Sequence, residues 1–226
     1  MRKTLILRAY QSARAKRAER RKAFTFIELV VIVVIVGILT AIAIPLIFAV
    51  DHLAQAREQL VLRLRYTQHL AVMDDKFDPY YVDWTHRRWQ FHCSATTRSC
   101  SIFAVSGNLA AASSDPDIND FAIDPQTRAK LTGGYASIVG IGGENSTPDL
   151  ALGNFHEITA IGKSNCGGGT DLRVIFDEIG RPYGLNEAST DQALLTKQCA
   201  ITLTHQDGQS ARVCIEPESG RVHDDC

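Results

Sequence analysis

One long uncharged segment constrains this chain more than any other feature. No charged residue occurs from residue 29 to residue 50. As a helix rising about 1.5 Å per residue, these residues would extend about 33 Å, enough to cross the roughly 30 Å hydrocarbon core of a membrane. A single carboxylate, Glu28, lies directly before the segment. Because an unpaired acid beside a membrane span is costly, the sequence predicts a functional role for Glu28 and a partner for its charge.

The near-neutral total charge hides a strong asymmetry. Residues 1–23 contain nine Lys or Arg and one Glu, a net charge of +8, and since the whole chain carries −1, the remainder carries −9. Lys and Arg that flank a span stay on its cytoplasmic side, so the C-terminal part is predicted to lie outside the cytoplasm. A secretory signal peptide fits less well, because the apolar segment is longer than a usual signal core. About 150 residues follow the helical part, enough for one domain with its own core.

Beyond Pro45 the pattern becomes that of an amphipathic helix. Residues recur at spacings of three and four in two mostly apolar rows, so one face is expected to pack on the chain's own domain and another to face neighbouring copies. The first row is Leu46, Val50, Leu53, Arg57, Leu60, Leu64 and Thr67, and the second is Leu62, Tyr66, Leu70 and Met73. Pro45 is expected to kink or loosen the helix. Asp74, Asp75 and Pro79 predict its end.

The rest of the chain predicts short strands. Runs rich in Val, Ile, Thr and aromatic residues are separated by clusters of Gly, Asn, Asp and Ser. These runs are residues 89–93, 100–105, 155–160, 172–176, 199–204 and 212–215, with a turn at 180–182. The predicted fold class is therefore α+β. A long N-terminal helix, membrane-spanning in its first half and amphipathic in its second, packs on an antiparallel β-rich domain.

Six cysteines, all beyond the apolar segment, predict three disulfides formed in an oxidising compartment. Cys93 and Cys100 flank a polar loop between two strand-like runs, so a bridge that closes this hairpin is favoured. Zinc binding is the alternative role for such cysteines. However, no cysteine pair has CxxC spacing, and no His lies at a ligand-like interval from a close pair. The sequence therefore favours disulfides over a metal site.

The other two pairings are less constrained by spacing. Cys199 and Cys214 flank a second predicted hairpin around Asp207-Gly208, which favours a bridge between them. A strict two-residue turn would leave this pair two positions out of register, so a longer loop or a bulge is required. Cys166 and Cys226 then remain for each other.

Two loop regions carry residues that could bind ligands. Residues 113–124 contain four carboxylates with the hard oxygen ligands that calcium prefers, namely Asp115, Asp117, Asp120 and Asp124. Because the twelve-residue EF-hand pattern is absent, a solvated acidic loop is favoured over calcium binding. The Gly-rich residues 133–153 and 166–170 lack a phosphate-binding motif, so we expect flexible loops there. Neither a metal nor a cofactor is predicted.

The N-terminal residues resemble the signal of type IV pilins and of the pseudopilins of type II secretion systems. The resemblance rests on the basic leader, the small residue Ala23, the sequence FTFIE at residues 24–28, the uncharged helix and Pro45. It implies cleavage by a prepilin peptidase between Ala23 and Phe24 and N-methylation of the new Phe24 amine. It also implies that Glu28 pairs with the N-terminal amine of a neighbouring subunit and sets the register of assembly. Ala23 departs from the glycine that is usual in the family.

The same resemblance implies a domain organisation and a location. Residues 1–23 form the leader that is removed, residues 24–50 the transmembrane and assembly helix, residues 51–75 its amphipathic continuation, and residues 76–226 a periplasmic β-rich domain. The chain would be a single-pass protein of the bacterial inner membrane that an assembly platform protein passes into a pilus or pseudopilus with other subunits. The phrases RWQFHC and IFDEIGRP further resemble the minor subunits that include the H pseudopilin and the FimT-type pilins.

Three classes of function are compatible with these features. The first is a minor pilin or pseudopilin subunit that supports protein secretion. The second is a DNA-binding subunit at a pilus tip during DNA uptake, for which Arg87, Arg88 and Trp89 are the local candidates, although a net charge of −9 argues against a general basic surface. The third is a membrane-anchored enzyme, but no GxSxG or HExxH motif occurs and the seven His are dispersed, so no catalytic residue is expected. The sequence favours the first class.

Overall fold

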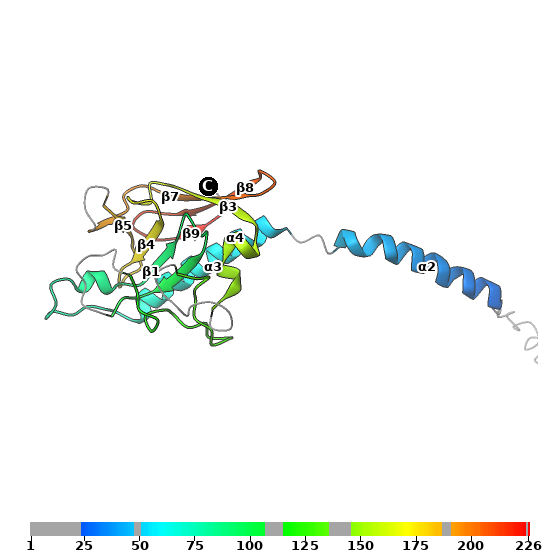
Figure 1. Cartoon of the computed structure of the whole chain (residues 1–226), viewed down its shortest axis with the longest axis horizontal. Helices are drawn as coiled ribbons and strands as arrows, with labels where there is room; N and C mark the ends of the chain where they lie inside the picture. The colour runs from blue at the N-terminus through cyan, green and yellow to red at the C-terminus, as the bar shows by residue number, and fades with distance from the viewer. Residues whose placement is uncertain (1–23, 48–50, 107–114, 136–145, 187–190, 225) are drawn as a thin grey trace, which may run out of the picture. The chain divides into compact units, whose positions relative to one another are not determined.

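The chain divides into two units, Met1–Val50 and Asp51–Cys226. The computed structural model describes residues 24–47, 51–106, 115–135, 146–186, 191–224 and 226, and for residues 42–47 it describes the backbone alone. Helix α2 (Phe26–Ile47) belongs to the first unit, and helix α3 (His52–Met73) with all the named strands belongs to the second (Figure 1).

Helix α2 is apolar on every side over its described side chains. The residues from Phe26 to Ala41 are all exposed, and between Leu29 and Leu39 they are Val, Ile and Leu apart from Gly37. The hydroxyl of Thr40 donates back within the helix, to the carbonyls of Val36 at 2.9 Å and Gly37 at 3.0 Å. This helix therefore presents no polar face. Within the part of the chain that the structure describes, no helix reaches the combination of length and apolarity that a membrane span needs.

The N-terminal helix is shorter than the sequence predicts. One helix was expected over residues 24–75, whereas the structure contains two, α2 and α3. The second starts after Asp51, whose extended backbone (ψ 91°) is not helical and whose carboxylate accepts the backbone N–H of Ala54 at 2.9 Å. Such an N-cap satisfies a donor that a helix start leaves free, so it starts a new helix rather than continuing the first. Pro45, predicted as the kink, lies within α2.

The second unit is built from α3 and two antiparallel sheets, both of which contact this helix. The first sheet has the strand order β2-β1-β4-β5-β6 and the second has the order β3-β7-β8-β9. The bounds are β1 (Gln90–Cys93), β2 (Cys100–Phe103), β3 (Ile158–Ser164), β4 (Leu172–Phe176), β5 (Pro182–Leu185), β6 (Gln192–Leu194), β7 (Cys199–His205), β8 (Ser210–Ile215) and β9 (Val222–His223). Short helices in the described connections are η1 (Trp84–Arg87), η3 (Pro148–Leu150) and α4 (Leu152–Phe155). An α+β fold with antiparallel sheets is confirmed.

Helix α3 buries one face in the core between these elements. Its buried residues recur at spacings of three and four and include four members of the first row predicted from sequence. They are Leu53, Ala56, Leu60, Leu64, Thr67 and Ala71. In the second predicted row, Tyr66 and Leu70 pack partly against the core, whereas Leu62 and Met73 are exposed. Because each buried leucine contributes about 1.5–3 kcal/mol, this face accounts for much of the attachment of α3 to the sheets.

The predicted strands match the observed ones except at the edges. The run expected at residues 155–160 instead begins at Ile158, because Phe155 ends helix α4. Strands β5, β6 and β9 were not predicted. They are two to four residues long, and runs of that length show no clear period of two. The turn expected at residues 180–182 lies slightly earlier, between Asp177 and Arg181, with Gly180 at a φ of 84°, and Pro182 already begins β5.

The three disulfides are Cys93–Cys100, Cys166–Cys199 and Cys214–Cys226. The first confirms the predicted hairpin bridge, because Cys93 lies directly opposite Cys100 in the β1–β2 register. The other two predicted pairings, Cys199 with Cys214 and Cys166 with Cys226, are wrong.

The register of the β7–β8 hairpin explains this error. Its turn has three residues between His205 and Gln209, with Gly208 at a φ of 87°, and it places Ala200 opposite Cys214. Because neighbouring residues of a strand point to opposite faces of the sheet, Cys199 and Cys214 point apart. Each therefore binds a cysteine from outside the hairpin.

We expect the disulfides to stabilise the second unit in the order of the loops they close. The sequence separations are 33 residues for Cys166–Cys199, 12 for Cys214–Cys226 and 7 for Cys93–Cys100. Loop-closure entropy then predicts losses of about 3.7, 2.8 and 2.4 kcal/mol when each pair is changed to serine. Denaturant unfolding of the full chain, followed by tryptophan fluorescence, would measure these losses. Equal losses for the three paired variants would show that chain entropy does not set the order.

A buried polar network lies on the first sheet. The guanidinium of Arg173 on β4 donates to the side-chain oxygen of Gln90 on β1 at 2.8 Å, and both residues are buried. His92 on β1 is also buried, and its Nε2 lies 3.4 Å from a carboxylate oxygen of Asp171. Burial, followed by the charge of Arg173, lowers the pKa of His92 to about 4. The folded chain therefore holds this imidazole neutral.

We expect His92 to make the second unit sensitive to acid. The unfolded chain protonates this residue below its ordinary pKa of 6.5, whereas the folded chain does so only near pH 4. Its contribution is therefore complete above pH 6.5 and is lost as the pH falls from 6.5 to about 4, by roughly 3 kcal/mol. Comparing unfolding free energies at several pH values, His92→Gln should flatten this part of the profile. An unchanged slope would assign the acid sensitivity to other groups.

Candidate processing and assembly site

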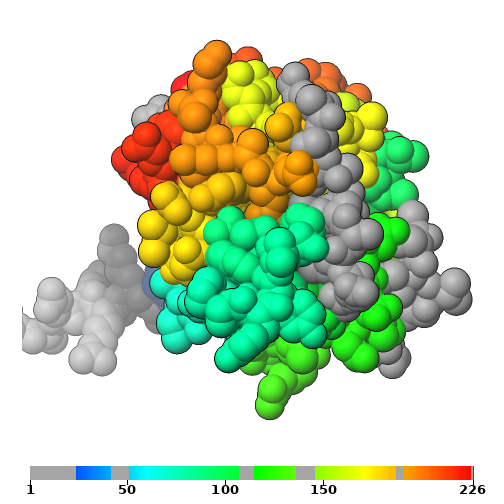
Figure 2. All heavy atoms as spheres, turned by 90° about the vertical axis from the view of Figure 1, so that its left-hand side faces the viewer, coloured from blue at the N-terminus to red at the C-terminus, as the bar shows by residue number. Residues whose placement is uncertain are grey.

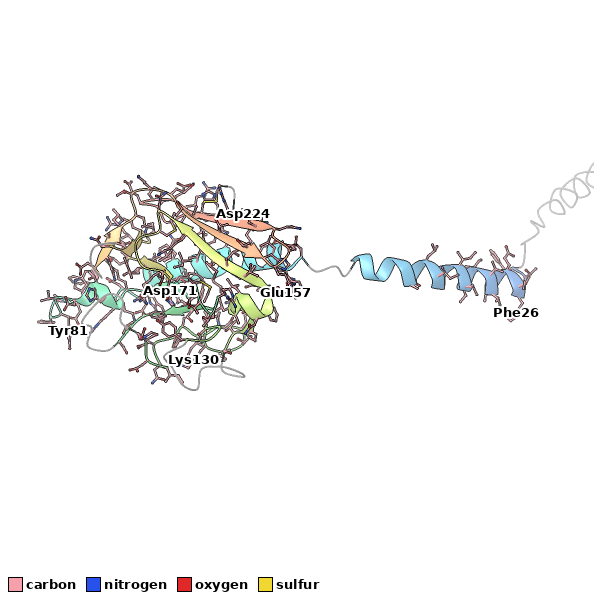
Figure 3. All side chains as sticks on the ribbon, turned by 45° about the horizontal axis from the view of Figure 1, so that its top comes forward. Phe26, Tyr81, Lys130, Glu157, Asp171 and Asp224 are labelled. Carbon is pink, nitrogen blue, oxygen red and sulfur yellow. A yellow bond between two sulfur atoms is a disulfide. The ribbon has the colours of Figure 1, made fainter. Side chains whose placement is uncertain are left out.

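The described chain begins at the residues that precede α2. Phe24 and Thr25 are not helical and are exposed, and the helix starts at Phe26, which Figure 3 labels at this end of α2. Ala23, the predicted residue before the cleavage site, lies outside the described residues. The predicted scissile bond therefore directly precedes a two-residue non-helical segment that leads into a helix.

Thr25 is the N-cap of α2. Its hydroxyl accepts the backbone N–H of Glu28 at 3.3 Å, and its carbonyl accepts the N–H of Leu29 at 3.2 Å. No role was predicted for Thr25 from the sequence, although its spacing to Glu28 is that of a capping box, S/T-x-x-E. This pattern sets where the helix begins, and it leaves Phe24 and Thr25 outside it.

Glu28 lies exposed in the first turn of α2. A carboxylate there interacts favourably with the unpaired N–H groups and partial positive charge of the helix start. Every described side chain from Leu29 to Leu39 that follows is apolar or glycine. Glu28 is thus a single negative charge at the start of the apolar part of α2. Its exposed carboxylate can form an ion pair with a cationic group outside its own helix.

The candidate DNA-binding residues make contacts within the second unit. Arg88 is buried, with its guanidinium 4.9 Å from the ring of Trp84 and 4.8 Å from that of Tyr183, and it forms an ion pair with Glu178 at 3.3 Å. Arg87 lies over the Tyr81 ring at 4.2 Å. These arginines are therefore engaged by aromatic rings and carboxylates.

Trp89, the third of these residues, is partly buried against the core. Its indole N–H donates to Asp74 at 3.0 Å. The indole therefore ties the start of β1 to the end of α3, which is a structural role.

The acidic residues 115–124 were expected to form a solvated loop, but not all of them are solvated. Asp120 and Asp124 are buried. The carboxylate of Asp120 accepts the N–H of Asp117 at 2.8 Å and that of Ser106 at 3.1 Å. These carboxylates have backbone donors within reach because they close turns, as Asp often does.

Asp124 also anchors this loop to α3. Arg63 donates to it at 3.2 Å and to Asp149 at 3.2 Å. Although burial opposes it, hydrogen bonds from the N–H groups of Gln126 and Thr127 and from Arg63 lower the pKa of Asp124. Among the described residues, no group of three His, Cys, Asp or Glu is placed to hold a metal ion.

The comparison with protein families identifies one motif. Residues 19–44 match the model described as the prokaryotic N-terminal methylation motif. This segment contains the predicted cleavage site, Thr25, Glu28 and most of α2. The match supports a protein of the type IV pilin-like or pseudopilin type, and it indicates a prepilin-peptidase substrate that assembles with other pilin subunits. No curated protein and no solved structure matches the chain significantly.

We expect Thr25→Ala to unwind the first turn of α2. Loss of an N-cap hydroxyl costs about 1 kcal/mol, and the freed N–H of Glu28 has no replacement acceptor on alanine. Backbone chemical shifts of residues 26–29, measured for the full chain in detergent micelles, should move toward random-coil values. Thr25→Ser keeps the hydroxyl and should retain the helical shifts. If both variants keep them, Thr25 does not determine where α2 begins.

Proposed function

We propose that this chain is a minor subunit of a type II secretion pseudopilus or a related type IV pilus-like fibre, and that it supports protein secretion. The observation that carries the proposal is the methylation motif at residues 19–44, because it coincides with a capped helix start and an apolar helix. The phrases that resemble the H pseudopilin and the FimT-type pilins favour a minor subunit over a major one. We propose an assembly role and no catalytic one.

The proposed route begins in the inner membrane. Prepilin peptidase cuts between Ala23 and Phe24 on the cytoplasmic side, where the basic leader is retained. The uncharged residues 29–50 anchor the chain, and residues 76–226 lie in the periplasm, where the six cysteines can be oxidised. An assembly platform protein then moves the processed chain from lipid into the fibre.

Within the fibre, Glu28 pairs with the amine of Phe24 of a neighbouring subunit. The carboxylate and the amine carry opposite charges, and both lie at the edge of an apolar environment in which an unpaired charge is costly. The apolar side chains of α2 exchange lipid contacts for contacts with other helices. Burial is then little changed, so close packing between helices supplies the attachment, and the ion pair determines the axial register.

DNA binding at a pilus tip is the weaker candidate. The chain after residue 23 carries a net charge of −9. Arg88 is buried in an ion pair, and Arg87 stacks on Tyr81. Phosphate contacts require accessible cations, so these contacts give no support to this function.

We expect Glu28→Ala to insert into the membrane normally and to enter fibres about tenfold less than the unchanged chain. The reason is that an unpaired N-terminal amine in an apolar fibre core costs more than 1.4 kcal/mol, the free energy of a tenfold change. Immunoblots of sheared fibres and of membrane fractions would measure both quantities. Glu28→Asp keeps the charge and should retain part of the incorporation.

Ala23→Arg provides the matched control for processing. This chain should remain a membrane precursor that keeps residues 1–23, as intact-mass measurement would show, whereas Glu28→Ala should begin at Phe24. Normal incorporation of Glu28→Ala would remove the ion pair from the proposal. Cleavage and incorporation of Ala23→Arg would remove the assigned cleavage site.

A further inference from the structure

The segment between α3 and β1 exposes a cluster of large apolar side chains. Tyr80 is 93% exposed and Val82 is 95% exposed. The cluster, here called the distal patch, consists of Val72, Met73, Phe77, Tyr80, Tyr81 and Val82. Tyr81 is labelled at this end of the second unit in Figure 3, and Figure 2 shows the same blue-green segment at the centre of the face.

The exposed apolar area is large for a protein surface. At about 200 Å² for each ring, the exposed fractions of Phe77, Tyr80 and Tyr81 correspond to about 400 Å². The aliphatic side chains of Val72, Met73 and Val82 add to it. The largest apolar patch on a typical monomer is about 300–600 Å², and patches of that size are often interaction sites. The distal patch could supply much of the roughly 800 Å² that each partner contributes to a standard interface.

Local hydrogen bonds fix the shape of this segment. The carboxylates of Asp75 and Asp78 accept the backbone N–H groups of Phe77 at 2.8 Å and Tyr80 at 3.0 Å. The N–H of Tyr81 donates to the carbonyl of Asp78 at 3.2 Å.

Two further contacts hold the segment against the rest of the unit. The ring of Phe77 packs edge-on against Trp84 at 5.1 Å. Gln192 on β6 donates to the carbonyl of Thr85 at 2.8 Å. The aromatic side chains are therefore displayed on an ordered support, and binding through them would not have to order a loose loop.

The charges around the distal patch select its partner. From residue 72 to residue 83, the exposed charged side chains are Asp74, Asp75 and Asp83. Within this segment, Lys76 pairs with Asp74, and Arg87 lies between the Tyr81 ring and Asp78, so the excess negative charge of the rim comes from Asp75 and Asp83. The surface is thus apolar at its centre and acidic at its rim. Nucleic acid and anionic lipid headgroups carry the same sign of charge and are disfavoured.

A second copy of this chain also fits poorly. Two distal patches facing each other would bring the same carboxylates together. An apolar groove of this unit, lined by Leu62, Tyr66 and Phe155, is bordered by Asp124 and Asp149, which share the single charge of Arg63. Two facing distal patches would therefore place acid against acid, and this groove offers a distal patch no excess of positive charge.

We propose that the distal patch docks a different protein whose surface carries an apolar cleft bordered by lysine or arginine. Tyr80 and Val82 enter the cleft, and Asp83 faces the basic rim. This docking uses the second unit and neither the cleavage site nor Glu28. It therefore goes beyond the proposed subunit role.

The test places the photoreactive residue p-benzoylphenylalanine at Tyr80 of the full chain in its host cell. After irradiation, we expect a covalent adduct with one protein, and mass spectrometry should map the linkage to an apolar surface that contains lysine or arginine. The same residue at Phe155, which is half-exposed in the other groove, is the control and should give no such adduct.

Charge variants test the acidic rim. The side chain of Asp83 makes no cap hydrogen bond to helix η1, so Asp83→Lys changes charge without removing a described contact. We expect it to lower the adduct yield about fivefold, the change that about 1 kcal/mol of like-charge repulsion produces. Asp117→Lys, at an exposed acid of another loop, should leave the yield unchanged.

Several outcomes would overturn the proposal. These are an adduct yield no higher than that of the Phe155 control, adducts with lipid, nucleic acid or a second copy alone, a mapped partner surface without basic residues, or equal effects of the two lysine variants. Fibre incorporation is not part of the readout. A failure of the proposed function would therefore be seen in the Glu28 variants and not in this test.

Discussion

The apolar surface of α2 is the constraint on which the chain's organisation depends. Val, Ile and Leu point outward in every direction over its described side chains, and each such residue gains about 1.5–3 kcal/mol when it leaves water. A helix with one apolar stripe can be covered by one domain, but a helix that is apolar all round needs surroundings on all sides. Lipid and a bundle of other apolar helices are two surroundings that satisfy this requirement, and the methylation motif covers most of this helix.

The second unit solves a different problem, because α3 has a single buried face. Leu53, Leu60 and Leu64 fill the core between the sheets, and Arg63 on another side of the helix ties two loops to it through Asp124 and Asp149. Asp51 caps the start of α3, and Trp89 holds its end through Asp74. The unit therefore fixes both ends and one face of α3 by its own contacts.

The sequence correctly predicted the features that depend on interactions between residues close in the chain. The FTFIE sequence, the uncharged helix, the buried row of α3 and the Cys93–Cys100 hairpin all depend on residues close in the chain, and they could be read from spacing. The caps at Thr25 and Asp51 were equally local, since S/T-x-x-E and an Asp before a helix are sequence signals. They were missed because the continuous apolar pattern predicted one long helix.

Features that depend on register or tertiary contact could not be read in this way. A change of one residue in the length of the β7–β8 turn decides whether Cys199 and Cys214 point to the same face of the sheet, and the sequence pattern does not determine that length. Likewise, Arg87 and Arg88 form a basic pair in the sequence, but Glu178 and Tyr183, about 90 residues further along, determine the surroundings of Arg88. Which of these charges remain accessible on the surface could therefore be learned only from the structure.

The two surfaces that carry the proposals differ in the physics of attachment. In the proposed fibre, the apolar side chains of α2 can pack against many neighbours, so we propose that the single charge of Glu28 supplies the register. The distal patch works differently, because a few aromatic side chains are held in fixed positions and an acidic rim excludes unsuitable partners. Because these surfaces lie in separate units and share no residue, evolution can change the docking partner without altering the processing signal or the helix that assembles.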